Sequence, residues 1–128
     1  MSSLIKPKRV LFVDDERLIA DTLAIIFSSQ GYETRAVYCA EQALELISDW
    51  LPNLAIIDVQ LPGMNGIDLA IRLKAEYPDC RLSLFSGRAS TSDLLEVARQ
   101  NGHSFDILAK PVPPAEFLAQ ASHLLYSN

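Results

Sequence analysis

Short apolar runs alternate with longer amphipathic stretches along this chain. The runs Val10–Val13 and Leu54–Ile57 are apolar at every position, a pattern typical of strands that are covered on both faces. Three more runs, rich in β-branched and aromatic residues, predict strands at Tyr32–Val37, Arg81–Phe85 and Phe105–Ala109. The chain is therefore expected to contain five strands.

The stretches between these strands have apolar residues at helical spacing. The clearest stripe lies on one face of a single helix and comprises Ala40, Ala43, Leu44, Ile47 and Leu51. The other four helices are marked by Ile19, Leu23 and Phe27, by the stretch Ile67–Tyr77, by Leu94, Val97 and Ala98, and by Phe117, Leu118, Ala121, Leu124 and Leu125. A glycine or proline follows each of the first four helices, at Gly31, Pro52, Pro78 and Gly102.

Five strand–helix units in succession predict an α/β fold of the (βα)₅ type. Its centre is expected to be a doubly wound parallel sheet, with helices on both faces and right-handed crossovers. In open sheets of this kind, ligands bind outside the carboxyl ends of the strands. The residues that follow each strand are therefore the place to look for chemistry.

Composition narrows the class of protein. The chain has 128 residues, 49 % of them apolar, which fits one globular domain, and its net charge of −5 argues against direct nucleic-acid binding by this chain. It has no apolar run of about 18 residues and no signal-peptide pattern, so we expect a cytoplasmic protein without a membrane partner. The two cysteines, Cys39 and Cys80, argue against a disulfide framework or a zinc site. We divide the chain into a flexible leader, residues 1–9, and one domain, residues 10–128.

Polar residues follow four of the five predicted strands. The segment Asp14–Glu16 follows the first strand, Asp58 the third, Ser86 the fourth and Lys110 the fifth. Aspartate and serine often cap helices, but that alternative explains only one or two of these residues. It explains neither Asp58, which precedes a Leu-Pro-Gly segment rather than a helix, nor a lysine that ends a buried strand.

These segments resemble the receiver domain of two-component response regulators. The resemblance rests on Val13–Glu16, on the stretch from Asp58 to Gly66, on Ser86-Gly87 and on Lys110-Pro111, which occur in the family's order and span essentially the whole chain. It implies a flavodoxin-like sheet with strand order 2-1-3-4-5. It also implies a bacterial signalling protein that catalyses only its own phosphorylation and dephosphorylation.

The resemblance gives each polar residue a role. Asp58 is implied to be the phosphoacceptor, and Ser86 and Lys110 are implied to stabilise the phosphoryl group and start a conformational switch. The implied Mg²⁺ ligands are Asp14, Asp15, Asp58 and the backbone carbonyl of Gln60. The charges of three carboxylates balance those of Mg²⁺ and one lysine. A phosphoryl group of about −2 on an aspartyl ester leaves one net negative charge, which recruits the serine hydroxyl.

Four further positions modify this pattern. Ile107 stands where most receivers have an aromatic residue, so we expect weaker coupling between Asp58 and the output surface. Gln60 and Arg88 are implied to tune the phosphoryl lifetime, with a solvated loop cation as the equal alternative for Arg88. Pro111 is expected to follow a cis peptide bond, as is usual in the family.

The implied phosphodonor is a sensor histidine kinase or a phosphotransfer protein, and the output protein or domain is not identified. Dimerisation through the fourth helix, fifth strand and fifth helix is a further option.

Three other classes fit the sequence less well. A Mg²⁺-dependent phosphatase of the haloacid dehalogenase type would have an Asp-x-Asp pattern rather than adjacent aspartates. A flavin-binding module would need a phosphate-binding loop where three acids stand, and the full set of acids, hydroxyl and lysine argues against a pseudo-receiver with the fold but not the chemistry. The chain is either a stand-alone receiver or part of a longer regulator. Two histidines, His103 and His123, are expected to be surface residues rather than phosphohistidines.

Overall fold

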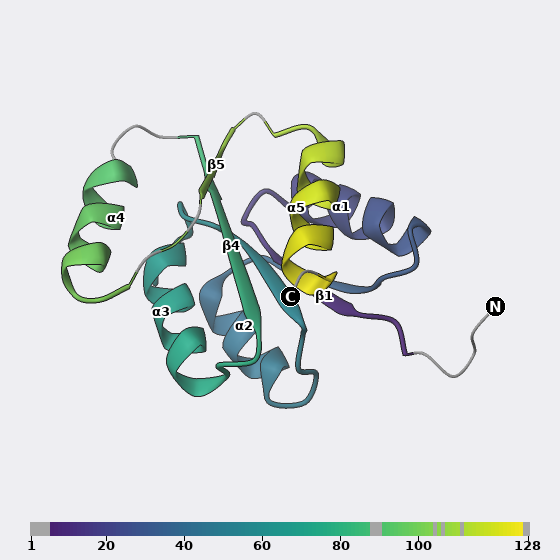
Figure 1. Cartoon of the computed structure of the whole chain (residues 1–128), viewed down its shortest axis with the longest axis horizontal. Coiled ribbons are helices and arrows are strands. Elements are labelled where there is room, and N and C mark those ends of the chain that lie inside the picture. Colours follow the sequence, from purple (N-terminus) through teal and green to yellow (C-terminus); the bar gives the residue numbers. More distant parts are fainter. Residues whose placement is uncertain (1–5, 88–90, 104, 106, 111, 127–128) are drawn as a thin grey trace.

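A parallel sheet with helices on both sides forms the centre of the molecule (Figure 1). The computed structural model describes residues 6–87, 91–103, 105, 107–110 and 112–126. Within these residues the strands are β1 (Arg9–Val13), β2 (Glu33–Val37), β3 (Leu54–Asp58), β4 (Arg81–Ser86) and β5 (Ile107–Ala109), and the helices are α1 (Arg17–Ser29), α2 (Ala40–Ile47), α3 (Gly66–Glu76), α4 (Thr91–Gln100) and α5 (Pro114–Tyr126). The strand order is β2-β1-β3-β4-β5, which confirms the predicted flavodoxin-like fold.

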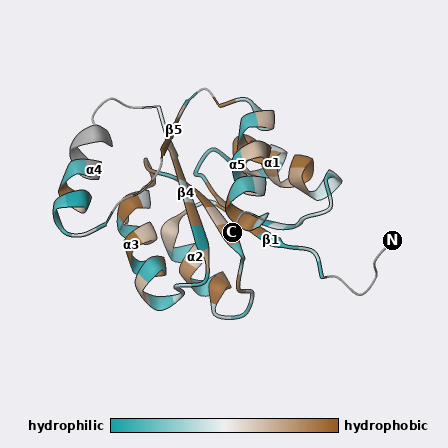
Figure 2. Ribbon diagram, viewed as in Figure 1, coloured by the Kyte–Doolittle hydropathy of each residue, from teal (hydrophilic) through white to brown (hydrophobic). Residues whose placement is uncertain are grey.

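Two hydrophobic cores lie on opposite faces of the sheet. Successive side chains of β1 point into different cores. Leu11 belongs to the core under α2, α3 and α4, whereas Phe12 belongs to the core under α1 and α5. In Figure 2 the central strands are largely brown, and the helices around them carry both brown and teal residues. The uninterrupted apolar runs of β1 and β3 thus supply both cores, and they hold the carboxyl ends of these strands in place.

Strand boundaries differ slightly from those expected. Asp58 and Ser86 are the last residues of β3 and β4 rather than the first residues after them. The fifth strand spans Ile107–Ala109 instead of Phe105–Ala109. Phe105 nevertheless packs against the same core as Ile107, as the alternation of side chains predicted.

The prediction that Leu51 continues the apolar stripe of α2 is wrong. The helix ends at Ile47, and the backbone turns so that the N–H of Trp50 bonds to the carbonyl of Leu46 at 2.9 Å. Trp50 then covers the core, and its indole N–H donates to Glu33 Oε1 at 3.0 Å, while Leu51 is 49 % exposed. The turn removes Leu51 from the helical face, and the larger apolar side chain takes its place.

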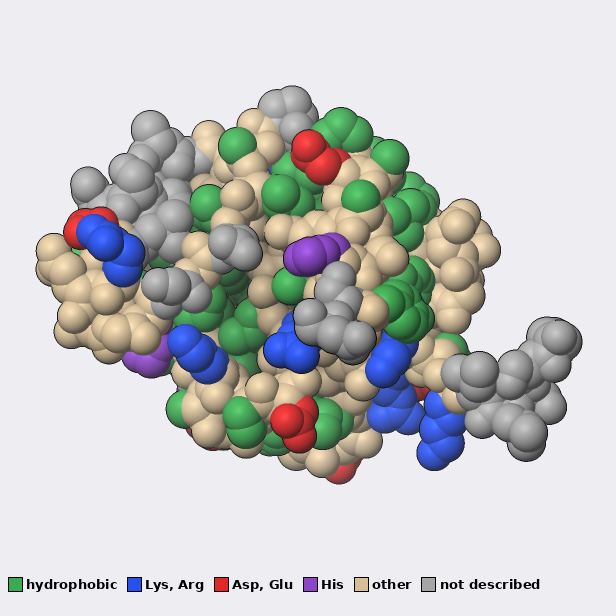
Figure 3. Space-filling model, in the orientation of Figure 1, with side chains coloured by type: hydrophobic (Ala, Val, Ile, Leu, Met, Phe, Trp, Pro, Cys, Tyr) green, Lys and Arg blue, Asp and Glu red, His purple; other side chains and the backbone are tan. Residues whose placement is uncertain are grey.

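The amino ends of the strands hold the first basic residues of the chain. Arg9, expected in the leader, begins β1 and pairs with Glu33 at 2.9 Å. Lys6, Lys8 and Arg9 line one hollow, and Figure 3 shows Lys and Arg side chains gathered where the chain enters the sheet. This basic group lies at the edge of the sheet opposite to Asp58. No helix within the described residues is both long and apolar enough to cross a membrane.

Candidate phosphoacceptor site

Strand register brings the predicted site residues to one edge of the sheet. Val13 of β1 pairs with Ile57 of β3, so Asp14 and Asp58 follow at the same level. Ser86 of β4 pairs with Ala109 of β5, and the N–H of the next residue, Lys110, donates to the carbonyl of Ser86 at 2.9 Å. Residues far apart in the sequence thus become neighbours because each ends a parallel strand.

Three carboxylates form the acidic part of the site. One oxygen from each of Asp14, Asp15 and Asp58 lies within 4.8 Å of the other two. Asp14 and Asp58 are only 1 % and 2 % exposed, whereas Asp15 is exposed. Like charges at about this separation repel by roughly 3–4 kcal/mol at the effective dielectric of a protein. A bound cation would relieve this repulsion between the three carboxylates.

Within the part of the chain that the structure describes, Asp14 has the carboxylate oxygen that most clearly lacks a positive partner. One of its oxygens accepts a hydrogen bond from the N–H of Glu16 at 3.0 Å, but the other, Oδ2, is buried without a hydrogen-bond partner among the described residues. Burial and the nearby charge of Asp58 raise the pKa of the Asp14 carboxyl to about 7. A buried carboxylate oxygen with no donor fits a hard divalent cation, and Mg²⁺ prefers oxygen ligands of this kind. The residues present therefore fit the metal that the sequence implied.

Lys110 supplies positive charge next to Asp58. Its ammonium donates to Asp58 Oδ2 at 3.0 Å, lies 4.0 Å from Glu16 Oε1 and sits over the ring of Phe85 at 5.0 Å. Burial acts to lower the pKa of the lysine, but the hydrogen bond and the charge of Asp58 outweigh it and raise the pKa. Lys110 is therefore a stable cation that points at the proposed acceptor.

A hydrogen bond links the serine to the loop after β3. The hydroxyl of Ser86 donates to Oε1 of Gln60 at 2.7 Å, and the backbone N–H of Gln60 donates to Asp58 Oδ1 at 3.0 Å. The resemblance implied a carbonyl ligand and a lifetime-tuning role for Gln60, but nothing in the sequence indicated this side-chain contact. No sequence pattern marks such a contact, because it depends on how the loop after β3 folds against the end of β4.

Gly66 is a second residue that sequence analysis did not single out as functional. It begins α3, and its N–H donates to the carbonyl of Val59 at 2.9 Å. A Cβ atom there would lie 2.1 Å from the carbonyl oxygen of Asp58 and 2.8 Å from Cα of Val59. Only glycine lets the helix start so close to the acceptor. Its place at the end of the Leu-Pro-Gly-Met-Asn-Gly segment was the available signal.

The remaining predicted positions lie partly outside this cluster. Arg88 and Pro111 fall outside the described residues. Ile107 is half-buried and pairs with Leu84 of β4. His103 is half-buried, and within the described residues its buried Nδ1 has no hydrogen-bond partner, so it is less exposed than expected. His123 is exposed on α5, as expected.

A doubly wound sheet in this order, with acids, a hydroxyl and a lysine at its carboxyl edge, defines a receiver-type domain. The family model of the response regulator receiver domain matches residues 10–122. The chain therefore belongs to the response regulator receiver family, the receivers of two-component signalling, which interact with histidine kinases and output domains.

Known relatives agree with this assignment. The chain is 31 % identical over 121 residues to the DNA-binding response regulator MtrA of Mycobacterium tuberculosis, covering 94 % of this chain and 52 % of that protein. It is similar to a solved CheY-like receiver protein from Methanospirillum hungatei, with a TM-score of 0.83, 30 % identity and coverage of 93 % and 94 % of the two chains. The receiver domain of NtrX from Brucella abortus aligns with a TM-score of 0.79, 30 % identity and coverage of 93 % and 99 %. The chain spans about half the length of the curated relatives that it matches.

Proposed function

We propose that Asp58 accepts a phosphoryl group in a Mg²⁺-dependent reaction, and that its phosphorylation changes a partner-binding surface. The observation that supports this most is the set of groups around Asp58: two acidic neighbours, Asp14 and Asp15, and the ammonium of Lys110 at 3.0 Å. Lys110 can neutralise part of the charge of an incoming phosphoryl group, and the carboxylates can hold the cation that would neutralise the rest. The chain's own chemistry is limited to transfer onto and off this residue, so we propose a signalling module rather than an enzyme with a separate substrate.

In the proposed reaction, an oxygen of Asp58 forms a bond to phosphorus while the bond from phosphorus to the donor's imidazole nitrogen breaks. The imidazole leaves with a proton, and the product is an aspartyl phosphate. Catalysis of such transfers is mostly positioning and charge stabilisation. Lys110 is placed to pair with the phosphoryl oxygens, and Ser86 to donate a hydrogen bond once it turns inward. Mg²⁺, held by Asp14, Asp15, Asp58 and the Gln60 carbonyl, would neutralise charge at the acceptor.

Acetyl phosphate tests the proposal without the need for a cognate kinase. With Mg²⁺ present, the intact mass of the wild-type chain should rise by one phosphoryl group. A chain that stays unmodified under these conditions contradicts the proposal and favours the pseudo-receiver. Steady hydrolysis of unrelated small phosphate esters favours the phosphatase class instead.

Magnesium should change the effect of neutralising Asp14. In EDTA we expect Asp14→Asn to be more stable than the wild type, because a buried carboxylate without a cation is replaced by a neutral amide. At a Mg²⁺ concentration ten times the Kd, the wild type should gain about 1.4 kcal/mol, whereas the variant should gain much less. Urea unfolding with and without Mg²⁺ measures both differences. Equal gains in the two proteins would contradict the proposed ligand.

The switch itself is proposed to run from Ser86 through β5. The aromatic residue that most receivers have at position 107 is isoleucine here, and the nearby ring of Phe105 is stacked on His103, with the ammonium of Lys74 at 5.7 Å. We therefore propose weaker coupling between Asp58 and the surface formed by α4, β5 and α5, which is also the candidate surface for dimerisation.

Replacing Ile107 tests that coupling. In Ile107→Tyr we expect larger changes of the β5 amide chemical shifts on phosphorylation than in the wild type, because an aromatic side chain can follow the serine hydroxyl inward. Two-dimensional NMR spectra before and after phosphorylation give the comparison. If the wild-type shifts change as completely as those of the variant, the proposal of weak coupling is wrong.

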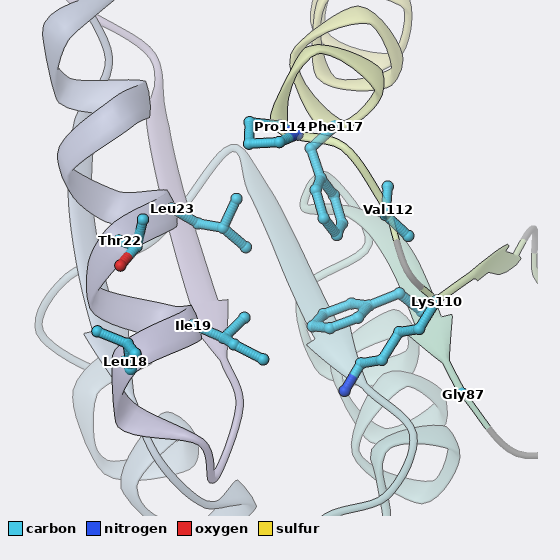
Figure 4. A pocket seen from close by; sticks show the side chains of 10 residues that line it. Leu18, Ile19, Thr22, Leu23, Gly87, Lys110, Val112, Pro114 and Phe117 are labelled. Carbon is cyan, nitrogen blue, oxygen red and sulfur yellow. The ribbon is translucent and has the colours of Figure 1, made fainter.

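An apolar cavity beside Lys110 supports docking of the phosphodonor at α1. A donor imidazole must reach Asp58, so its protein must cover this edge of the sheet. The cavity, of about 500 Å³, lies between α1 and the segment after β5 (Figure 4) and is lined mainly by apolar side chains, among them Leu18, Ile19, Leu23, Val112, Pro114 and Phe117. Leu18 at its rim is 79 % exposed. We propose that a helix of the histidine kinase or phosphotransfer protein packs here.

A polar residue at position 18 should slow phosphorylation by a histidine kinase but not phosphorylation by acetyl phosphate. We expect Leu18→Ser to lower kcat/KM for phosphorylation by a histidine kinase about 10-fold, since an interfacial leucine contributes on the order of 1–2 kcal/mol. The rate with acetyl phosphate should stay unchanged, because a small donor needs no docking surface. A panel of purified kinases first identifies one that phosphorylates the wild type. An equal loss with both donors would contradict the docking role.

The remaining proposals follow the family pattern. Gln60 and Arg88 are proposed to tune the lifetime of the phosphoryl group by flanking the path of attacking water. The bond before Pro111 is proposed to be cis. We propose that the domain acts in the cytoplasm, without binding nucleic acid itself.

A further inference from the structure

The hydrogen bond between Ser86 and Gln60 joins the end of β4 to the loop that follows Asp58. Ser86 Oγ lies 2.7 Å from Gln60 Oε1, an ordinary length for a bond between a hydroxyl and a carbonyl oxygen. Ser86 is 6 % exposed, so bulk water has little access to replace this partner. The bond is therefore a defined feature of the unphosphorylated site.

This bond competes with the function proposed for Ser86. A serine hydroxyl has one proton to donate. While that proton is donated to the amide oxygen of Gln60, it cannot be donated to a phosphoryl oxygen on Asp58. The serine must leave Gln60 before it can stabilise the transferred group.

The backbone of Gln60 is fixed where this competition takes place. Its N–H donates to Asp58 Oδ1 at 3.0 Å, and the next residue, Leu61, donates its N–H to the carbonyl of Val59 at 3.1 Å. The loop is thus tied to the acceptor itself. The side chain of Gln60 therefore binds Ser86 from a backbone that is itself held by hydrogen bonds.

We propose that Gln60 is a positioning residue that holds the Ser86 hydroxyl away from the phosphoryl site. The proposal rests on the phosphoacceptor function given above. Phosphorylation then proceeds from the fraction of molecules in which the Ser86–Gln60 bond is broken. The rate is therefore proportional to that fraction. The bond lowers the rate of phosphorylation from within the site itself.

A double-mutant cycle with acetyl phosphate and Mg²⁺ tests this role. Gln60→Met keeps a side chain of similar length but removes the acceptor oxygen. The initial rate of phosphorylation should rise about 2- to 12-fold, the range that corresponds to the net value of one hydrogen bond. In the Ser86→Ala background the same substitution should leave the rate unchanged, because the donor is absent. Initial rates separate this effect from any change in phosphoryl lifetime.

Gln42→Met is the matched control. Gln42 also accepts one hydrogen bond with its amide oxygen, from the N–H of Tyr38 at 2.8 Å, and has no contact with Ser86 among the hydrogen bonds described. Its rate should equal that of the wild type. Thermal unfolding of all variants identifies any that is not folded, and Gln60→Leu provides a second removal of the acceptor oxygen.

The outcomes separate this inference from the function on which it rests. A faster Gln60→Met whose advantage disappears in Ser86→Ala supports the positioning role. An unchanged rate in Gln60→Met, or the same fold-change in both backgrounds, overturns it while the phosphoacceptor function stands. A wild type that takes up no phosphoryl group overturns both.

Discussion

Alanine at position 58 is expected to abolish uptake of a phosphoryl group while leaving the domain folded. The Asp58 carboxylate is the group that Lys110 contacts at 3.0 Å and that shares the acidic cluster with Asp14 and Asp15. Its loss removes the nucleophile itself rather than a supporting contact. After incubation with acetyl phosphate and Mg²⁺, intact mass spectrometry should show one phosphoryl group on the wild type and none on Asp58→Ala.

Asp79→Ala is the control for this substitution. Asp79 is an exposed aspartate that precedes β4, at the opposite edge of the sheet from the acceptor. The variant should be phosphorylated as fast as the wild type. Circular dichroism of both variants checks that they are folded. A phosphoryl group that persists on Asp58→Ala, located by peptide mapping at another carboxylate, would disprove the assignment of Asp58.

Alanine at position 66 is expected to have the largest effect on stability. The added Cβ would meet the backbone of Asp58 and Val59 at 2.1–2.8 Å, and neither backbone can move without shifting β3 or α3. We expect a loss of about 3 kcal/mol or more in the free energy of unfolding, at the upper end for overpacked sites. Urea denaturation gives the value from the change in the midpoint.

Gly87→Ala provides the comparison. A Cβ at position 87 would lie 3.5 Å from the side chain of Lys110, an ordinary van der Waals contact. Its stability should therefore change by less than about 1 kcal/mol, because no atom has to move. If Gly66→Ala were as stable as Gly87→Ala, the close packing of α3 on the acceptor loop would be wrong.

Much of the fold was readable from periodicity because the strands are buried on both sides. The uninterrupted apolar runs of β1 and β3 have few alternative interpretations, and the order of strands and helices followed from them. Leu51 shows the limit of this reasoning. A stripe of apolar residues does not reveal where the backbone leaves the helix, and here a tryptophan two residues after Ser48, the C-cap of α2, took the core position.

Which residues form the candidate site could also be predicted largely from the sequence. Residues that end parallel strands must meet at one edge, so Asp14, Asp58, Ser86 and Lys110 could be placed together before any coordinates. The contacts within the edge could not. The bond from Ser86 to Gln60 depends on the path of a loop, and the tight approach of Gly66 depends on how a helix packs on a strand.

The outermost strands have a further consequence for how this domain behaves at high concentration. At one margin of the sheet, β5 is short, with three residues in the described part of the chain, and at the other, β2 carries the charged residues Glu33 and Arg35. A strand of another molecule can form few backbone hydrogen bonds with a short edge strand, and charged side chains disfavour its pairing with the other edge. The molecule should consequently resist fibril-like polymerisation even when crowded, leaving its helical flanks as the surfaces on which assemblies form.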